Sequence, residues 1–134
     1  MKKENTGQTT DKAFSEECNV VLNAVGDAMY AIGGKWKLRI IISIARGNKR
    51  FSELQRQIAG ISGRVLSSEL KELESNGLLV KKVSVGYPVL IEYELTPYSQ
   101  TLEKVVEHLV DWGKQHREKI KREFSASNTS TTGH

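Results

Sequence analysis

The sequence predicts an α+β fold that is mostly helical, and three observations support this prediction. Most of the 134 residues fall into amphipathic segments whose apolar side chains recur every three or four positions. Serine, threonine and glycine residues stand at the ends of these segments, where helix caps are usually found. Only two runs, residues 78–85 and 89–95, are rich in β-forming residues, and they flank a turn that reads "GYP".

The chain is expected to form one domain between two polar ends. Residues 1–16 and 125–134 contain few apolar side chains, so we expect both segments to be disordered and the folded domain to span residues 17–124. The N-terminal segment lacks the apolar core of a secretory signal, and no apolar run is long enough to span a membrane. A single cysteine, Cys18, excludes an internal disulfide framework. We therefore expect a cytoplasmic protein without a membrane partner.

Two helices are predicted in the first third of the chain. The first shows apolar residues at helical spacing from Asn19 to Ile32, and the glycine pair at 33–34 ends it. The second runs from about Lys35 to Gly47, a residue type that commonly follows the last turn of a helix. Its apolar side chains surround most of its circumference, which is typical of a helix buried between other elements.

A pair of short helices follows. Ser52 is expected to cap the first of them, with Gln55 three residues later completing a capping box, and this helix should end by Gly60. Ser62 is expected to cap the second helix, which should occupy residues 62–75.

The rest of the chain predicts a hairpin and a long helix. The two β-rich runs form the hairpin, which is expected to span residues 78–96. Thr96 as cap and Pro97 as the first helical residue are expected to open the last helix. The complete order is helix, helix, short helix, turn, helix, hairpin and long helix. This order defines a winged helix-turn-helix with an additional helix at each end.

Helix 62–75 has two chemically different faces. At 100° per residue, its leucines fall together on one side: Leu66, Leu70 and Leu73. The opposite side carries hydrogen-bonding groups: Arg64, Ser68, Lys71 and Ser75, with Ser67 at the edge. Such a helix suits the major groove of double-stranded DNA, where Arg binds guanine and Ser binds several base edges. An ordinary amphipathic helix with a solvated face is the alternative.

Positive charge is concentrated around this helix. The chain has a net charge of +4, yet residues 35–82 contain 11 Lys and Arg against 4 Asp and Glu, whereas the other residues contain 9 against 12. A basic segment between acidic ones indicates a surface that faces a polyanion, and scattered solvated lysines are the alternative. The candidate phosphate contacts are Lys81 and Lys82 on the hairpin, Lys49 and Arg50, and Ser52 at a helix N-terminus.

The two end helices carry apolar stripes that need cover. The stripe residues expected at a dimer interface are Val21, Val25, Met29, Leu102, Val105, Val106, Leu109 and Trp112. We expect a second copy of the chain to cover them, because a two-fold dimer places two reading helices about 34 Å apart, on successive major grooves of an inverted repeat. The alternative is that the two helices cover each other within one chain.

Enzymatic activity is not expected. The sequence has no nucleophile–base pair, carboxylate cluster, cofactor fingerprint or metal-ligand spacing, so neither a cofactor nor a metal is expected. RNA fits less well than duplex DNA, since the basic side has no aromatic stacking surface. Protein–protein contacts and non-specific duplex binding are the alternatives, because a winged helix alone does not define function. A small effector is a further candidate partner near Tyr30, Trp36 or Trp112, although these aromatic residues are better explained as core.

Three stretches together carry a family pattern: "AIGGKWKLRII" (31–41), "KRFSELQRQIAGISGRVLSSELKELESNGLL" (49–79) and "IEYELTPYSQTL" (91–102). Over residues 20–115 the chain resembles the HxlR-type winged helix-turn-helix regulators, relatives of the MarR-type group. The resemblance implies a dimeric bacterial transcriptional regulator without catalytic activity. It also implies that the terminal helices build the dimer and that the hairpin is the wing.

The resemblance further assigns roles to residues of helix 62–75. It implies that Ser62 and Arg64 begin the reading helix. The outward side chains that follow, Ser67, Ser68 and Lys71, would then set target preference.

The sequence departs from the family pattern at two positions. Many members carry a cysteine thirteen residues before the tryptophan of "GGKW", which serves some of them as a redox or electrophile sensor. Here Asn23 occupies that position, and Cys18 is left as a displaced redox-thiol candidate, favoured if it lies at a helix N-terminus. Leu90 stands where many members have a basic residue before the second strand, so Lys81 and Lys82 are the positive groups of the wing.

Overall fold

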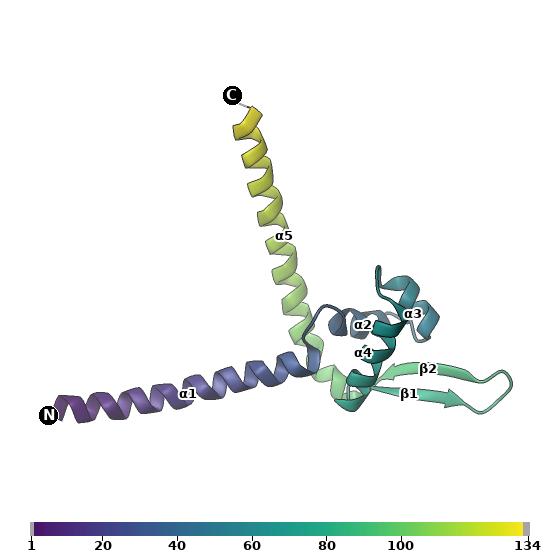
Figure 1. Cartoon of the computed structure of the whole chain (residues 1–134), viewed down its shortest axis with the longest axis horizontal. Helices are drawn as coiled ribbons and strands as arrows, with labels where there is room; N and C mark the ends of the chain where they lie inside the picture. The colour runs from purple at the N-terminus through teal and green to yellow at the C-terminus, as the bar shows by residue number, and fades with distance from the viewer. Residues whose placement is uncertain (1, 133–134) are drawn as a thin grey trace. The chain divides into compact units, whose positions relative to one another are not determined.

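A computed structural model describes residues 2–132, with side chains described for residue 13 and residues 15–127. In chain order (Figure 1) the elements are α1 (Lys2–Ile32), α2 (Lys37–Ala45), α3 (Phe51–Gln57), α4 (Gly63–Ser75), β1 (Leu79–Ser84), β2 (Leu90–Leu95), the 3₁₀ helix η1 (Pro97–Leu102) and α5 (Glu103–Thr132). The predicted α+β class, mostly helical, is confirmed. The chain divides into two units, residues 1–95 and residues 96–134.

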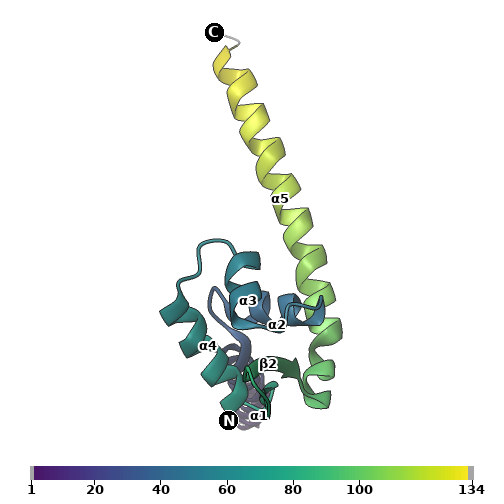
Figure 2. The ribbon, with the colours of Figure 1, turned by 90° about the vertical axis from the view of Figure 1, so that its right-hand side faces the viewer.

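The core of the first unit forms around α2, which contacts both α3 and α4 (Figure 2). The buried side chains of α2 include Ile40, Ile41 and Ile44. The other buried apolar residues of this unit are Ile32, Leu54, Ile58, Ile61, Leu66, Leu70, Leu73, Leu78 and Leu79. The predicted burial of α2 is confirmed, and the core consists almost entirely of leucine and isoleucine.

The turn between α3 and α4 follows the predicted chemistry at one cap and departs from it at the other. Ser62 Oγ accepts a hydrogen bond from the backbone N–H of Val65 at 3.1 Å, so the predicted cap of α4 is confirmed. The prediction that Ser52 caps α3 is wrong, because α3 already begins at Phe51. Instead, the backbone N–H of Arg50 donates to Glu53 Oε1 at 3.3 Å, the acidic half of a capping box.

The hairpin is the only sheet in the part of the chain that the structure describes. Strands β1 and β2 pair antiparallel, with Leu79 opposite Leu95 at the inner end and Ser84 opposite Leu90 at the outer end. The backbone N–H of Tyr93 also donates to the carbonyl of Lys49 at 2.8 Å. The connection before α3 is therefore tied to the inner half of β2.

The second unit opens with a 3₁₀ helix rather than with an α-helix. Thr96 Oγ1 accepts from the backbone N–H of Ser99 at 3.3 Å, which confirms the predicted cap. The hydroxyls of Ser99 and Thr101 donate to backbone carbonyls three residues earlier, which competes with α-helical hydrogen bonding. The predicted α-helix therefore begins at Glu103 and not at Pro97.

Helices α1 and α5 are longer than the sequence predicts. The structure assigns helix to residues 2–16 and 125–132, where disorder was expected. Lengthening an existing helix is more favourable than starting one, because each added residue gains a backbone hydrogen bond. Residues 17–124 as the limits of the folded domain stay a prediction. No helix within the described residues is both long and apolar enough to cross a membrane.

Candidate nucleic-acid interface

Helix α4 has one buried face and one exposed face. Leu66, Leu70 and Leu73 are 0%, 2% and 0% exposed, so the leucine side is fully packed. The side chains on the opposite side are Arg64, Ser68, Lys71 and Ser75, all exposed, with Ser67 half-buried at the edge. These are the two faces that the sequence predicts. The exposed face offers a guanidinium, an ammonium and hydroxyls, which together can address base edges and phosphates.

Ser62 lies at the N-terminus of this helix, where its hydroxyl oxygen serves as the cap. A hydroxyl keeps one O–H donor while its oxygen accepts a hydrogen bond. Because Ser62 is exposed and its O–H can rotate, that donor is accessible to a phosphate oxygen. One residue therefore fits both a structural and a binding role.

The residues before α3 form a second exposed basic group. Lys49, Arg50 and Ser52 are all exposed. The hydrogen bond from the Tyr93 backbone to the Lys49 carbonyl places Lys49 beside β2. Lys81 lies opposite Tyr93 on β1, so Lys49 and Lys81, far apart in the sequence, lie at the same part of the hairpin. Burial raises the pKa of the Tyr93 phenol, with the charge of Glu74 as a smaller cause.

On the wing, the two predicted phosphate contacts differ from each other. Lys82 Nζ lies 2.9 Å from Glu94 Oε2 across the hairpin. Its hydrogen bond with Glu94 raises the pKa of Lys82, and the same bond lowers the pKa of Glu94. Lys81 is exposed and lies opposite Tyr93 in the strand register. The positive charge of Lys82 is thus partly offset, a pairing that only the register of the strands reveals.

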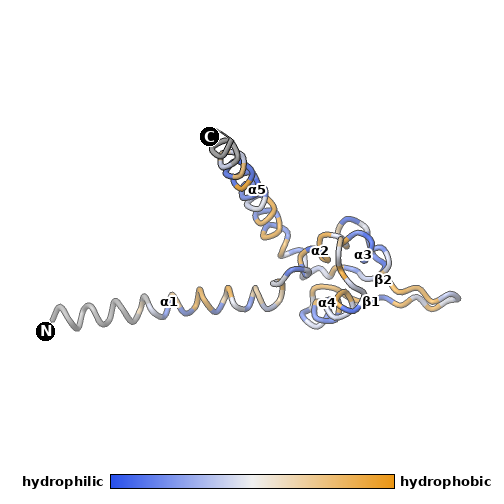
Figure 3. The backbone as a smooth tube through the Cα atoms, turned by 45° about the horizontal axis from the view of Figure 1, so that its top comes forward, coloured by the Kyte–Doolittle hydropathy of each residue, from blue (hydrophilic) through white to orange (hydrophobic). Residues whose placement is uncertain are grey.

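The outer half of the hairpin is uncharged and apolar (Figure 3). Val85 and Tyr87 are fully exposed at the tip, and further exposed apolar residues are Val83, Val89, Leu90 and Ile91. No residue between 83 and 91 carries a charge. The cations of the wing are therefore confined to its inner half.

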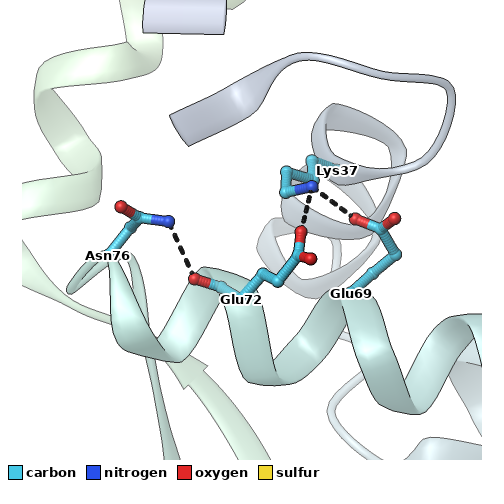
Figure 4. Close-up of polar contacts among 4 residues, drawn as sticks. All are labelled: Lys37, Glu69, Glu72 and Asn76. Carbon is cyan, nitrogen blue, oxygen red and sulfur yellow. Dashed lines mark hydrogen bonds and ion pairs between the residues drawn. The ribbon is translucent and has the colours of Figure 1, made fainter. Parts of the chain in front are cut away.

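The structure also brings together a polar cluster that sequence reasoning missed. Lys37 of α2 is buried, and its Nζ lies 2.8 Å from Glu69 Oε2 and 2.5 Å from Glu72 Oε2 of α4 (Figure 4). Asn76 Nδ2 donates to the backbone carbonyl of Glu72 at 2.9 Å. Burial alone lowers the pKa of Lys37, but the hydrogen bonds and charges of Glu69 and Glu72 outweigh it and raise this pKa. The available sequence signal was a lysine at the start of a helix whose apolar pattern indicates burial.

The apolar stripes of α1 and α5 are exposed in the single chain. On α1 the exposed residues are Val21, Val25 and Met29, and on α5 they are Val105, Leu109 and Trp112, with Leu102 and Val106 half-buried. Tyr30 and Trp112 are also exposed, so their assignment to the core of the chain is wrong. An open depression of about 510 Å³ lies beside Tyr30 and Lys71.

Cys18 does not lie at the N-terminus of a helix. It is exposed, but α1 begins at Lys2, so Cys18 sits in the interior of the helix rather than near its start. The position that would favour a redox thiol is therefore not the one that Cys18 occupies, because the helix extends further than the apolar pattern indicates. No group of residues suited to hold a metal ion occurs among the described side chains.

A capped turn, an amphipathic helix with an exposed polar face and a following hairpin define a winged helix-turn-helix protein. Residues 31–121 match the family described as HxlR-like helix-turn-helix. The chain belongs to this family, which consists of transcriptional regulators and not of enzymes. The predicted family is thereby confirmed, and so is the prediction that the protein is a regulator and not an enzyme.

Known proteins of similar sequence and structure agree with this assignment. The HTH-type transcriptional regulator BH0655 of Halalkalibacterium halodurans is 43% identical over 96 residues, which are 71% of this chain and 85% of that protein. YdeP of Bacillus subtilis, also an HTH-type transcriptional regulator, is 38% identical over 89 residues, or 66% and 70% of the two chains. The redox regulator HypR in its reduced form is similar in structure, with a TM-score of 0.68 and 35% identity over 73% of this chain and 97% of that one.

Proposed function

We propose that the protein binds double-stranded DNA sequence-specifically, as a homodimer on an inverted-repeat operator, and thereby regulates transcription in the cytoplasm. The observation that supports this most is the outward face of α4, where Arg64, Ser68 and Lys71 are exposed opposite a fully buried leucine face. Arg pairs with guanine in two hydrogen bonds, which reads a base as well as adding affinity.

Phosphate contacts would orient this helix on the duplex. Lys49, Arg50 and Ser52 before and within α3, together with Lys81 and Lys82 of the wing, are exposed cations or hydroxyls suited to phosphate oxygens. Such contacts hold the protein in register without reading sequence. Ser62 at the start of α4 adds a hydroxyl donor to the same set.

A second copy of the chain is the partner proposed for the stripes of α1 and α5. Side chains such as Val25, Leu109 and Trp112 are about half or more exposed, and a row of exposed apolar residues of this kind marks an interaction surface. A two-fold dimer would present two α4 helices to successive major grooves. A redox role for Cys18 and a small effector beside Tyr30 stay predictions, which thiol titration and ligand screening would test.

Replacing Arg64 with alanine tests the role of α4. Affinity for the best operator should fall by about 1–3 kcal/mol, and discrimination should relax at one base pair. Fluorescence anisotropy with single-base operator variants measures both quantities, and Arg117→Ala on α5 is a matched control. Unchanged affinity and unchanged discrimination in Arg64→Ala would contradict the assignment.

A module for protein contacts is the second candidate function. The uncharged outer half of the wing favours it, because Val85 and Tyr87 are fully exposed in a region without a cation. Salt dependence separates the two candidates. DNA binding weakens steeply with salt as counterions are released, whereas binding through an apolar wing does not.

A further inference from the structure

Two kinds of contact hold α4 against α2. The leucine face of α4 and Ile40 of α2 are buried where the two helices contact each other, and apolar packing has little directional preference. The ion pairs of Lys37 are directional, because charged hydrogen bonds favour short distances and defined angles. The packing keeps α4 in place, and the ion pairs select one orientation.

Lys37 forms ion pairs with two carboxylates that lie one helical turn apart on the same side of α4. Glu69 and Glu72 are three residues apart, close to one helical turn, and the ammonium lies between their carboxylates (Figure 4). A slip of one residue would rotate the helix by about 100° and shift it by about 1.5 Å, which would break both contacts. The cluster therefore restricts rotation about the helix axis as well as movement along it.

Burial makes this restriction strong. Lys37 is 8% exposed, and Glu69 Oε2 is buried with the Lys37 ammonium as its compensating group among the described residues. A buried charge that loses its partner is strongly unfavourable, so an orientation that separates these groups is disfavoured. Lys37 also neutralises carboxylates that would otherwise lie beside the outward face of α4.

The outward residues directly precede the paired carboxylates in sequence. Ser68 comes before Glu69 and Lys71 before Glu72, so any rotation of the carboxylates moves the outward side chains equally. Reading groups must be held within about 0.5 Å and 10–20° of their productive geometry. We propose that Lys37 is a positioning residue for DNA recognition, which sets the rotation and axial position of α4 and thereby the discrimination between operator and other DNA. This inference rests on the proposed sequence-specific function.

Four variants separate positioning from stability. Lys37→Met removes the ammonium at similar length, and Glu69→Gln/Glu72→Gln removes both negative charges. The triple variant carries all three changes and leaves no buried charge unpaired. Lys35→Met is the matched control, since Lys35 is an exposed cation over the Trp36 ring at the start of α2. Each protein is measured for its thermal midpoint and for its affinity to a selected operator and to a scrambled duplex, at a temperature where all are folded.

The triple variant gives the decisive result. We expect it to recover most of the thermal midpoint lost in Lys37→Met, because no buried charge remains unpaired. Its ratio of operator to scrambled affinity should stay about tenfold below that of the wild type. Lys35→Met should weaken both duplexes alike and keep the ratio.

Two other results would overturn the proposal, and they are distinguishable. If the triple variant discriminates as well as the wild type, Lys37 contributes stability only, and the proposed function stands. If the wild type itself does not discriminate between operator and scrambled duplex, the sequence-specific function fails, and the positioning role fails with it.

Discussion

Helices α4 and α5 are both amphipathic, but only α4 has its apolar side covered within the chain. Leu66 and Leu73 of α4 are 0% exposed, whereas Leu109 and Trp112 of α5 are 45% and 62% exposed. The sequence patterns alone look alike, since both helices show apolar residues at spacings of three and four positions. The difference lies in what each helix packs against.

This difference fits the two roles in the proposed function, DNA binding and association with a second copy. The packed leucines of α4 are satisfied inside the chain, so its polar face is the part left for a partner. In α5, as in α1, the apolar face itself is left uncovered, which favours association with another protein surface. A fully packed α4 together with exposed apolar stripes on α1 and α5 is what we expect of a regulator that binds DNA as a dimer.

A charge placed in the α5 stripe should have the largest effect. In Leu109→Asp the buried charge would prevent association, so light scattering should report a monomer. Operator affinity should then approach that of non-specific DNA, a loss on the order of 10³-fold. Gln115→Asp is the matched control, because it adds the same charge away from the stripe. A dimeric mass for Leu109→Asp would place the stripe outside the interface.

The same truncation on the two helices should give different losses of stability. Leu70→Ala removes a buried side chain and should lower the free energy of unfolding by about 2–5 kcal/mol, independent of protein concentration. Leu109→Ala should have a smaller effect that depends on protein concentration, since in the proposed dimer Leu109 is covered by the partner. Urea unfolding at two protein concentrations compares them. Equal, concentration-independent losses would contradict the distinction between the helices.

The ion pair of buried Lys37 should make the stability of the folded protein depend on pH at alkaline values. The raised pKa of Lys37 means that the folded chain holds this proton to higher pH than the unfolded chain does. The stability it contributes is therefore fully present below the ordinary lysine value of 10.5 and is lost as the pH rises through the folded value. Thermal unfolding from pH 9 to 12 should show a steeper decline above pH 10.5 for the wild type than for Lys37→Met. Parallel curves would mean that the pair adds no proton-linked stability.

The smallest expected effects are on the wing, where the two lysines can be compared directly. Lys81→Ala should weaken binding to all duplexes similarly and reduce the slope of log affinity against log salt by about 0.9. Lys82→Ala should change the slope less, because Glu94 already offsets its charge. Titrations at several salt concentrations measure both slopes. A loss confined to one sequence would instead assign base contacts to these lysines.

Local signals in the sequence account for much of this fold. The glycines after α2 and α4, Gly47 and Gly77, have φ values of 107° and 75°, a backbone conformation that other residues rarely adopt. Ser62 and Thr96 cap their helices as predicted. The two faces of α4 also follow from its period alone, because its own residues decide which side is apolar.

Features that depend on distant residues were not predictable in this way. The Lys37 cluster joins residues more than thirty positions apart, and the pairing of Lys82 with Glu94 needs the strand register.

Two local features also differ from the prediction. The prediction places the cap of α3 at Ser52 because serine is a strong capping type, whereas the structure uses Glu53 with the Arg50 backbone. The 3₁₀ turn at Pro97–Leu102 depends on hydroxyl hydrogen bonds that spacing does not reveal.

Selection of genomic DNA tests the central claim most directly. Fragmented DNA of the source organism is bound to the purified wild-type protein at near-physiological salt, recovered and sequenced, with Arg64→Ala treated in parallel. We predict enrichment of a few promoter fragments that share an inverted repeat with half-sites about one helical turn apart, and a weaker, altered pattern for Arg64→Ala. Uniform recovery of all fragments by the wild type would contradict sequence-specific binding by α4.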